Sequence, residues 1–121
     1  MVKEEVKRWW KQAKEDIDSA NYLFEGKKYK EASFFCQQAA EKALKAALLK
    51  KKKKLLKIHD LIKLAKEIGI GGDILDGCER LTAIYIDSRY PDTVNNEYTY
   101  EETIEDIATA KNILKWVEKN I

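Results

Sequence analysis

The chain has 121 residues, of which 45% are hydrophobic and 36% are charged, and its formal net charge is +2. This composition excludes an intrinsically disordered chain. The small net charge excludes a global positive field for nucleic-acid binding, so any such contact must come from a local patch. No apolar run approaches the roughly 18 residues that a membrane-spanning helix needs. We therefore expect a soluble, cytoplasmic protein with one domain over residues 1–121.

The first predicted helix runs from about Lys3 to Glu25. Its apolar residues recur at steps of three and four, which is typical of a helix with one buried face. They are Val6, Trp10, Ala13, Ile17, Ala20 and Phe24. Gly26 is predicted to end the helix, because glycine tolerates the left-handed conformation that ends helices. Only Lys27 and Lys28 then precede the next helix, and so short a link predicts an antiparallel pair.

The stretch Tyr29–Leu49 is predicted to be the central helix. It contains six alanines and neither Gly nor Pro, which favours a helix. Apolar residues cover more than half of its circumference, which indicates neighbours on two or three sides. The helix is expected to fray within Lys50–Lys54, because adjacent like charges repel. Such a run is typical of a solvated helix end, and the alternative is a contact with RNA or phosphate in which Lys52 and Lys53 bind the ligand.

Two polar side chains of the central helix, Gln37 and Glu41, are candidates for a buried polar brace, with a ligand contact as the alternative. Glu41 and Lys45 are four residues apart, so they can form an ion pair along one face of the helix. A buried Glu41 would need a charged partner, because an unpaired buried charge is strongly destabilising. Arg89 is a candidate for that partner.

His59 and Asp60 are predicted to open a shorter third helix that runs through about Ile68. His59 is expected to cap this helix, and Asp60 suits its first turn, where negative charge is favourable. After a glycine-containing loop, Asp73 is predicted to be the N-cap of a fourth helix. That helix should end near Ser88–Tyr90, because the proline that follows favours an extended conformation in the residue before it.

The last predicted helix begins at a capping box, with Thr99 as the cap and Glu102 reaching back, and it runs to about Asn120. Its inward residues are expected to be Ile104, Ile107, Ala108, Leu114 and Val117. Ile113 and Trp116 lie off that stripe, which indicates a partner surface such as a homodimer interface. Together these patterns predict an all-α protein, an antiparallel up-and-down bundle of four long helices plus one short helix.

The segment after the fourth helix holds the strongest candidate site, which is built around Arg89. A guanidinium presents a rigid fork of donors that fits a phosphate or a carboxylate, and Tyr90 and Asp92 are candidate ligand-binding neighbours. The alternative is that Arg89 pairs with a nearby acidic residue and only holds the turn. The spacing of Cys, His and Asp predicts no metal site or cofactor. Cys36 and Cys78 are predicted to be buried, reduced thiols.

Three motifs occur in order along the chain: Gln37–Ala46, with the sequence QQAAEKALKA, then His59–Leu61 and Ser88–Asp92. Together with the Trp-rich first helix they resemble the HEPN domain family of small helical proteins. In HEPN ribonucleases an Arg is followed, after four to six residues, by a His. The resemblance implies that such a pair cleaves RNA without a metal, usually across a homodimer interface, with the 2′-hydroxyl of the RNA attacking the phosphate.

The chain departs from the ribonuclease pattern, because Asn95 and Asn96 stand where the His would follow Arg89. Asparagine can bond a phosphate or a base, but it does not carry a proton near neutral pH. The resemblance therefore implies a non-catalytic or weakly active homodimer that binds a nucleotide or RNA phosphate near Arg89. It also implies a nucleotidyltransferase as the protein partner, in a toxin–antitoxin-like system.

Two alternatives stay open at this point. One is a metal-independent ribonuclease in which Arg89 acts with an unconventional second residue, namely Asn95, Asn96 or His59. The other is a purely structural protein-interaction module in which the turn around Arg89 only shapes the fold. The missing His favours binding over cleavage, whereas the lysine run is compatible with RNA.

Overall fold

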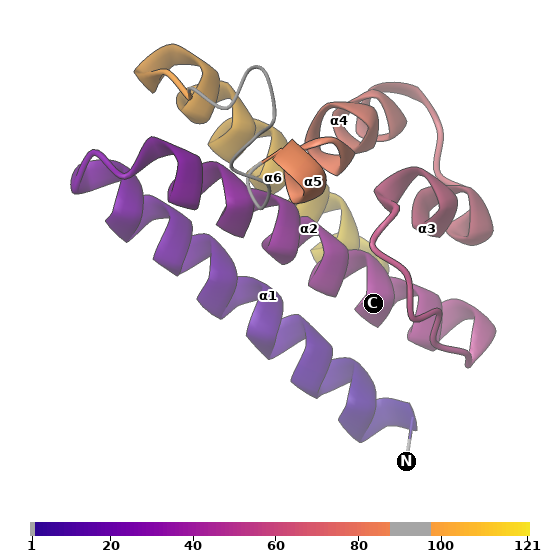
Figure 1. The fold of residues 1–121 in the computed structure, drawn as a ribbon. Coiled ribbons are helices and arrows are strands. Elements are labelled where there is room, and N and C mark those ends of the chain that lie inside the picture. Colours follow the sequence, from indigo (N-terminus) through magenta and orange to yellow (C-terminus); the bar gives the residue numbers. More distant parts are fainter. Residues whose placement is uncertain (1, 88–97) are drawn as a thin grey trace.

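The computed structural model describes residues 2–87 and 98–121, and every regular element in these ranges is an α-helix (Figure 1). The elements are α1 (Val2–Glu25), α2 (Tyr29–Lys52), α3 (Leu61–Ile68), α4 (Gly72–Thr82), α5 (Ile84–Asp87) and α6 (Tyr100–Asn120). The predicted all-α class is confirmed. The helix expected to continue as far as Ser88–Tyr90 is divided in the described part, because α4 ends at Thr82 and α5 starts at Ile84.

α1 and α2 form an antiparallel hairpin along the length of the bundle, as the short link between them predicted (Figure 1). The turn uses a different residue from the expected one. Lys27 has a φ of 63° and adopts the left-handed conformation, whereas Gly26 does not. The amide of Gly26 still bonds the carbonyl of Tyr22 at 3.2 Å. Gly26 therefore continues the last turn of α1, and the reversal falls one residue later.

α2 is the central helix, since it packs against each of the other five helices of the described part. Fourteen of its residues are buried, which agrees with neighbours on several sides. Its small alanine side chains allow those neighbours to approach closely. The helix ends at Lys52, within the lysine run as predicted, and Lys53 closes it in the left-handed conformation with a φ of 55°.

Asp60 caps α3, and the expectation that His59 caps this helix is wrong. The Asp60 carboxylate accepts bonds from the amides of Ile62 at 2.9 Å and Lys63 at 3.2 Å. An aspartate in an extended conformation immediately before a helix satisfies amides that lack a partner in the first turn. The ring of His59 instead turns toward α2.

α4 begins two residues earlier than predicted. Gly71 occupies the N-cap position in an extended conformation, and Asp73 lies inside the first turn. Asp73 is thus not the N-cap, although its charge still suits the positive end of the helix dipole. α4 lies close to α6, because a Cβ atom at Gly77 would stand 2.8 Å from Cγ2 of Thr109. The absence of a side chain at Gly77 permits this approach.

The buried face of α6 contains Ile107, Leu114 and Val117, as predicted, but it differs from the expected face at three other positions. Ile104 is 40% exposed and Ala108 is exposed, whereas Ile113 is 1% exposed. The physical reason is that α6 packs on both α2 and α4. Ile113 lies against α4, near Gly77. The apolar strip that suggested a partner surface is therefore covered in part by this chain itself. Trp116 is half-buried against the main core.

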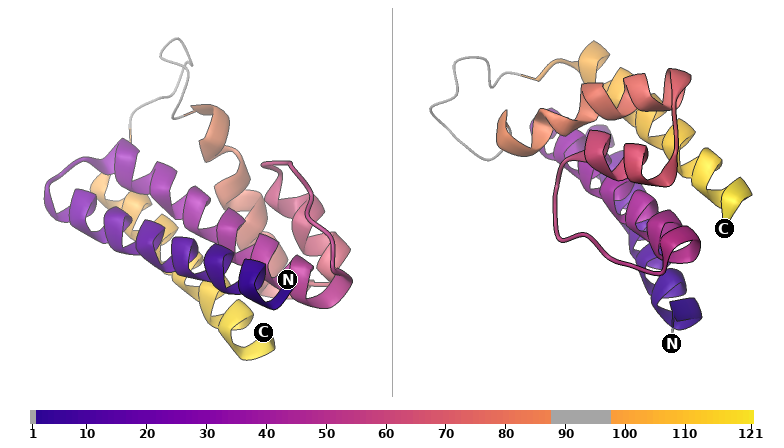
Figure 2. Two further views of the ribbon diagram at one scale, coloured as in Figure 1. Left: turned by 90° about the horizontal axis from the view of Figure 1, so that it is seen from below. Right: turned by 90° about the vertical axis from the view of Figure 1, so that its right-hand side faces the viewer.

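The first turns of α1, the last turns of α2 and the end of α6 meet at one end of the bundle (Figure 2). A small buried cluster of Val6, Ala46 and Leu49 lies there, with Trp10 and Ile121 packed against it. Within the described ranges, none of the helices combines the length and the apolarity that crossing a membrane requires.

Candidate functional site

Glu41 is the centre of a buried polar cluster on α2. Its side chain is 3% exposed, and Nζ of Lys45 lies 2.9 Å from Oε2. Nε2 of Gln37 donates to Oε1 at 3.1 Å. Nδ1 of His59 lies 3.0 Å from Oε1 and 3.2 Å from Oε2. We call these four residues the Glu41 cluster. It joins one face of α2 to the segment that leads into α3.

The carboxyl group of Glu41 is held in its ionised form. Burial raises its pKa, but hydrogen bonds from Lys45, His59 and Gln37 outweigh burial and lower the pKa below the ordinary value of 4.5. Lys45 is also buried, and its ammonium lies 5.4 Å from the ring centre of Trp9. The predicted pair of Glu41 with Lys45 is therefore formed, and in the described part its other partners are Gln37 and His59.

His59 is the exposed member of the Glu41 cluster. Half of its side chain, 50%, is accessible, while Nδ1 faces the carboxylate of Glu41. Because an ionised carboxylate only accepts hydrogen bonds, Nδ1 carries a proton, and in the neutral form of the ring Nε2 is left as an acceptor. A carboxylate that fixes the tautomer and orientation of a histidine in this way is a common arrangement where the second ring nitrogen meets a ligand.

The imidazole of His59 stacks on the ring of Tyr85, with centroids 4.1 Å apart and planes 14° apart. Tyr85 belongs to α5. In the sequence, Arg89 follows Tyr85 by four positions. The stack therefore connects the only histidine of the chain to the short helix from which the predicted phosphate-binding segment continues.

The predicted site residues divide into three groups. Arg89, Tyr90, Asp92, Asn95 and Asn96 lie outside the described residues. The two predicted members of the polar brace, Gln37 and Glu41, come together in the Glu41 cluster. The third group consists of the two lysines of the run.

Lys52 and Lys53 are exposed at the end of α2. Lys52 is eleven residues beyond Glu41, which corresponds to about 17 Å along a helix. These lysines are thus not part of the Glu41 cluster. A ligand would have to extend along α2 to touch both places.

A second buried polar cluster joins α2, α4 and α6. Asp106 is 4% exposed; it accepts a bond from Ser33 at 2.8 Å and one from Nε of Arg80 at 2.7 Å. Oγ1 of Thr103 lies 3.1 Å from Oγ of Ser33. We call these four residues the Asp106 cluster. Burial raises the pKa of Asp106 more than the bonds from Ser33 and Arg80 lower it, and the charge of Glu102 raises it further.

The cysteine prediction agrees with the structure. Cys36 and Cys78 are both buried and free. Burial raises the pKa of the Cys78 thiol to about 12 and that of Cys36 well above its usual range. Both thiols are therefore protonated and unreactive at neutral pH. The part of the chain that the structure describes contains no group of three or more His, Cys, Asp or Glu residues able to hold a metal ion.

Sequence reasoning missed two features of the candidate site. The contact of His59 with Glu41 spans eighteen positions, and the stack on Tyr85 spans twenty-six in the sequence. Neither has a local spacing signal. The position of His59 just before Asp60 indicated a helix cap instead.

Comparisons with known proteins agree with this architecture. A family model described as the HEPN domain matches residues 6–120. The crystal structure of TT1696 from Thermus thermophilus has a TM-score of 0.89 and 28% sequence identity, and the match covers 96% of this chain and 98% of that chain. The crystal structure of ST0689, an archaeal HEPN homologue, has a TM-score of 0.82 and 31% identity, and the match covers 94% of this chain and 95% of that chain. No curated protein gave a significant match.

Proposed function

The chain belongs to the HEPN domain family, and on that premise we propose that it binds the phosphate of a nucleotide or of an RNA strand through Arg89 with the help of His59. The observation that carries this proposal is the placement of the His59 ring. Glu41 orients the ring through Nδ1, half of the side chain is exposed, and the ring stacks on Tyr85. This ring lies against α5, the helix that precedes Arg89 in the sequence.

The two side chains suit a phosphate in complementary ways. A guanidinium supplies a planar pair of donors and is always charged. An imidazole held through Nδ1 offers Nε2 as an acceptor when neutral and as a donor when protonated, so it can adapt to a phosphate or to a hydroxyl. Tyr90 and Asp92 are proposed as further ligand contacts, and Lys52 and Lys53 as contacts for a longer RNA.

The biological setting that we propose comes from the family alone. Small HEPN proteins that resemble this chain act with a nucleotidyltransferase in toxin–antitoxin-like pairs, usually as homodimers. We propose the same kind of partner here, with this chain as the binding member rather than the catalytic one. Co-purification with a candidate nucleotidyltransferase, and mass measurement of the purified protein in solution, test the two parts of this proposal.

Binding is tested with ATP and with a short single-stranded RNA as probes, by calorimetry at low and at high salt. Arg89→Ala is expected to reduce affinity about tenfold or more, and higher salt should weaken binding of the unaltered protein, because phosphate contacts are electrostatic. Arg8→Ala, which removes an exposed arginine of α1, is the matched control. If Arg89→Ala lowers the melting temperature and neither probe binds the unaltered protein, the segment is structural and the proposal is wrong.

A second candidate function, metal-independent cleavage of RNA, is favoured by the same pairing of His59 with Glu41. With Nδ1 protonated, Nε2 would take the proton of a 2′-hydroxyl while that oxygen attacks the phosphorus. The bond to the 5′ oxygen then breaks, and this oxygen takes a proton from water and leaves as a 5′-hydroxyl. Arg89 would stabilise the negative charge that develops on the phosphate. Glu41 would be a positioning residue. Asn95 and Asn96 would add hydrogen bonds to the phosphate in this scheme, because asparagine does not carry a proton near neutral pH.

Cleavage is tested by incubating the purified protein with a mixed RNA pool in EDTA. If this activity exists, Arg89→Ala and His59→Gln should each abolish it, and the products should carry 2′,3′-cyclic phosphates. His59→Gln keeps a polar side chain of similar reach but cannot carry a proton. Equal cleavage by the unaltered protein and by both variants would identify a contaminant, and absence of cleavage would leave only binding.

A further inference from the structure

A second surface lies at the end of the bundle where α1 begins and where α2 and α6 end. It is a pocket of about 550 Å³. Four lysines line it: Lys3 and Lys7 of α1, Lys50 of α2, and Lys53, the C-cap residue that follows α2. None of the residues proposed for phosphate binding except Lys53 belongs to it. Lys50 is nine residues beyond Glu41, which is about 14 Å along α2.

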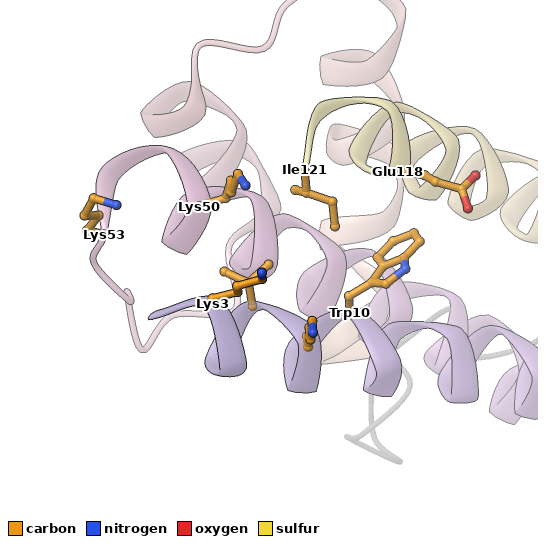
Figure 3. A pocket seen from close by; sticks show the side chains of 8 residues that line it. Lys3, Trp10, Lys50, Lys53, Glu118 and Ile121 are labelled. Atoms are coloured by element: carbon orange, nitrogen blue, oxygen red, sulfur yellow. The ribbon is translucent and has the colours of Figure 1, made fainter. Parts of the chain in front are cut away.

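The charge of this pocket is positive on balance. Four lysines and one glutamate, Glu118, line it, so the formal charge of its side chains is +3. Figure 3 shows the side chains of Trp10 and Ile121 between the lysines and Glu118. The pocket therefore offers cations on one side of an apolar centre. A matching ligand carries carboxylates or phosphates beside an apolar group.

The centre of the pocket is apolar. Val6, Trp10 and Ile121 form it, and all three belong to or pack on the small buried cluster at this end of the bundle. Tryptophan at the centre of a half-buried apolar surface, surrounded by charged side chains, is typical of a protein-binding hot spot. The volume of the pocket suits one or two bulky side chains of a partner.

The lining favours a peptide over a nucleotide. Among its described residues, the only polar side chains besides the indole are lysines and Glu118. A base needs several fixed donors and acceptors at its edges to be recognised, and amide or hydroxyl side chains usually supply them. Lysines are flexible point charges that suit carboxylates spread along a helix. Lys3 and Lys7 are four residues apart on α1, whereas Lys50 and Lys53 are three residues apart, with Lys50 in the last turn of α2 and Lys53 at its C-cap.

We propose that this pocket docks an acidic amphipathic segment of a partner protein, with a bulky apolar side chain against Trp10 and carboxylates against the four lysines. Such a helix-in-groove contact uses apolar anchors for affinity and charges for orientation. The contact goes beyond the proposed phosphate binding, because neither Arg89 nor His59 takes part in it.

The test uses a fluorescein-labelled helical peptide with leucines along one face and glutamates beside them, and a counterpart in which lysines replace the glutamates. Fluorescence anisotropy measures binding to the full chain. The acidic peptide should bind and the basic one should not. The double variant Lys3→Glu, Lys7→Glu should weaken binding about tenfold or more, because two attractive charges become repulsive.

Two further variants keep the test decisive. Lys11→Glu with Lys57→Glu makes the same change in net charge at exposed lysines outside the pocket, and it should change affinity less than about twofold. Ile121→Asp places a carboxylate in the apolar centre, at a residue whose side chain is only half-buried, and should abolish binding. Circular dichroism of each variant verifies the fold.

Several results would overturn the proposal. One is failure of the acidic peptide to bind at millimolar concentration. Another is an equal loss of affinity in the Lys3→Glu, Lys7→Glu variant and in the Lys11→Glu, Lys57→Glu variant, which would indicate general charge attraction. If ATP binds and the pocket variants weaken its binding as they are expected to weaken peptide binding, the pocket is a small-anion site instead. Arg89→Ala should leave peptide binding unchanged, so failure of this proposal and failure of phosphate binding give different results.

Discussion

The two buried polar clusters use the same components to different ends. Each has a carboxylate that is nearly inaccessible and a cation beside it, Glu41 with Lys45 and Asp106 with Arg80. In the Glu41 cluster the cation is buried, and the imidazole of His59 reaches the surface. In the Asp106 cluster the cation itself reaches the surface, where the side chain of Arg80 is 36% exposed.

The difference shows how a brace can be distinguished from a candidate site. Water can replace part of the pairing of Arg80, and Glu105 offers it a second carboxylate at 3.1 Å. The buried Lys45 has no such substitute among the described carboxylates. The Glu41 cluster thus uses an enclosed ion pair to hold one exposed histidine. That asymmetry is the structural basis for placing His59, and not Arg80, in the proposed function.

The largest expected effect is the loss of Glu41. Glu41→Ala should lower the free energy of unfolding by about 3–5 kcal/mol, because it leaves Lys45 buried without a partner. Asp106→Ala is the matched comparison and should cost clearly less, because Arg80 can turn to water and to Glu105. Urea denaturation at neutral pH measures both. Equal losses would contradict the contrast between the clusters.

A smaller effect is expected for Ser33, which is completely buried in the Asp106 cluster. Ser33→Ala should cost about 1–2 kcal/mol, because Asp106 and Thr103 each lose a buried hydrogen-bond partner. Thermal unfolding followed by circular dichroism is sufficient. Ser19→Ala, at a partly exposed position of α1, is the control and should be close to neutral. A neutral Ser33→Ala would mean that water replaces the hydroxyl.

The clusters should also respond oppositely to acid. The pKa of Glu41 is lowered, so its stabilising contribution is present above its ordinary value of 4.5 and is lost as the pH falls through the lower folded-state value. The pKa of Asp106 is raised from its ordinary value of 3.8, so its contribution is present at low pH and is lost as the pH rises through the folded-state value.

Glu41→Gln should therefore flatten the loss of stability between neutral pH and about pH 3, and Asp106→Asn should steepen it. Urea denaturation of the three proteins at a series of pH values checks the slopes. If both variants flatten the curve, Asp106 behaves as an ordinary ion-paired carboxylate, and the comparison must be revised.

The smallest effect on stability is expected for His59. Its side chain is half exposed, so His59→Gln should cost less than about 1 kcal/mol. The same variant should nevertheless weaken binding of ATP or RNA, if the proposed function is correct. A large loss of stability with unchanged binding would make His59 a structural residue. Lys57→Gln, a nearby exposed change, is the control.

Local patterns predicted the long helices well. The apolar stripe of α1, the alanine-rich α2 and the cap of α6 at Thr99 all depend on residues a few positions apart, which is the range over which helix geometry acts. The pairing of Glu41 with Lys45 was predictable for the same reason. The left-handed turn at Lys27 was not predictable, because glycine is the usual residue in this conformation but other residues also adopt it.

What could not be predicted depends on tertiary packing. Ile113 is buried because α4 covers it, and no spacing within α6 reveals a second neighbour. His59 turns to Glu41 because the path into α3 brings the ring over α2. The sequence therefore indicated Glu41 as part of a brace and His59 as a helix cap, while their contact was visible only in the structure. Arg89 remains a prediction.

The bond between Ser33 and Asp106 joins residues 73 positions apart, and this separation has a consequence for folding order. The hairpin of α1 and α2 forms from neighbouring segments, whereas α6 must close a long loop before it gains any contact, and such closure slows folding. We expect the amides of the hairpin to become protected from hydrogen exchange early during refolding. Protection near Ser33 and Asp106 would then mark the moment at which the C-terminal helix docks.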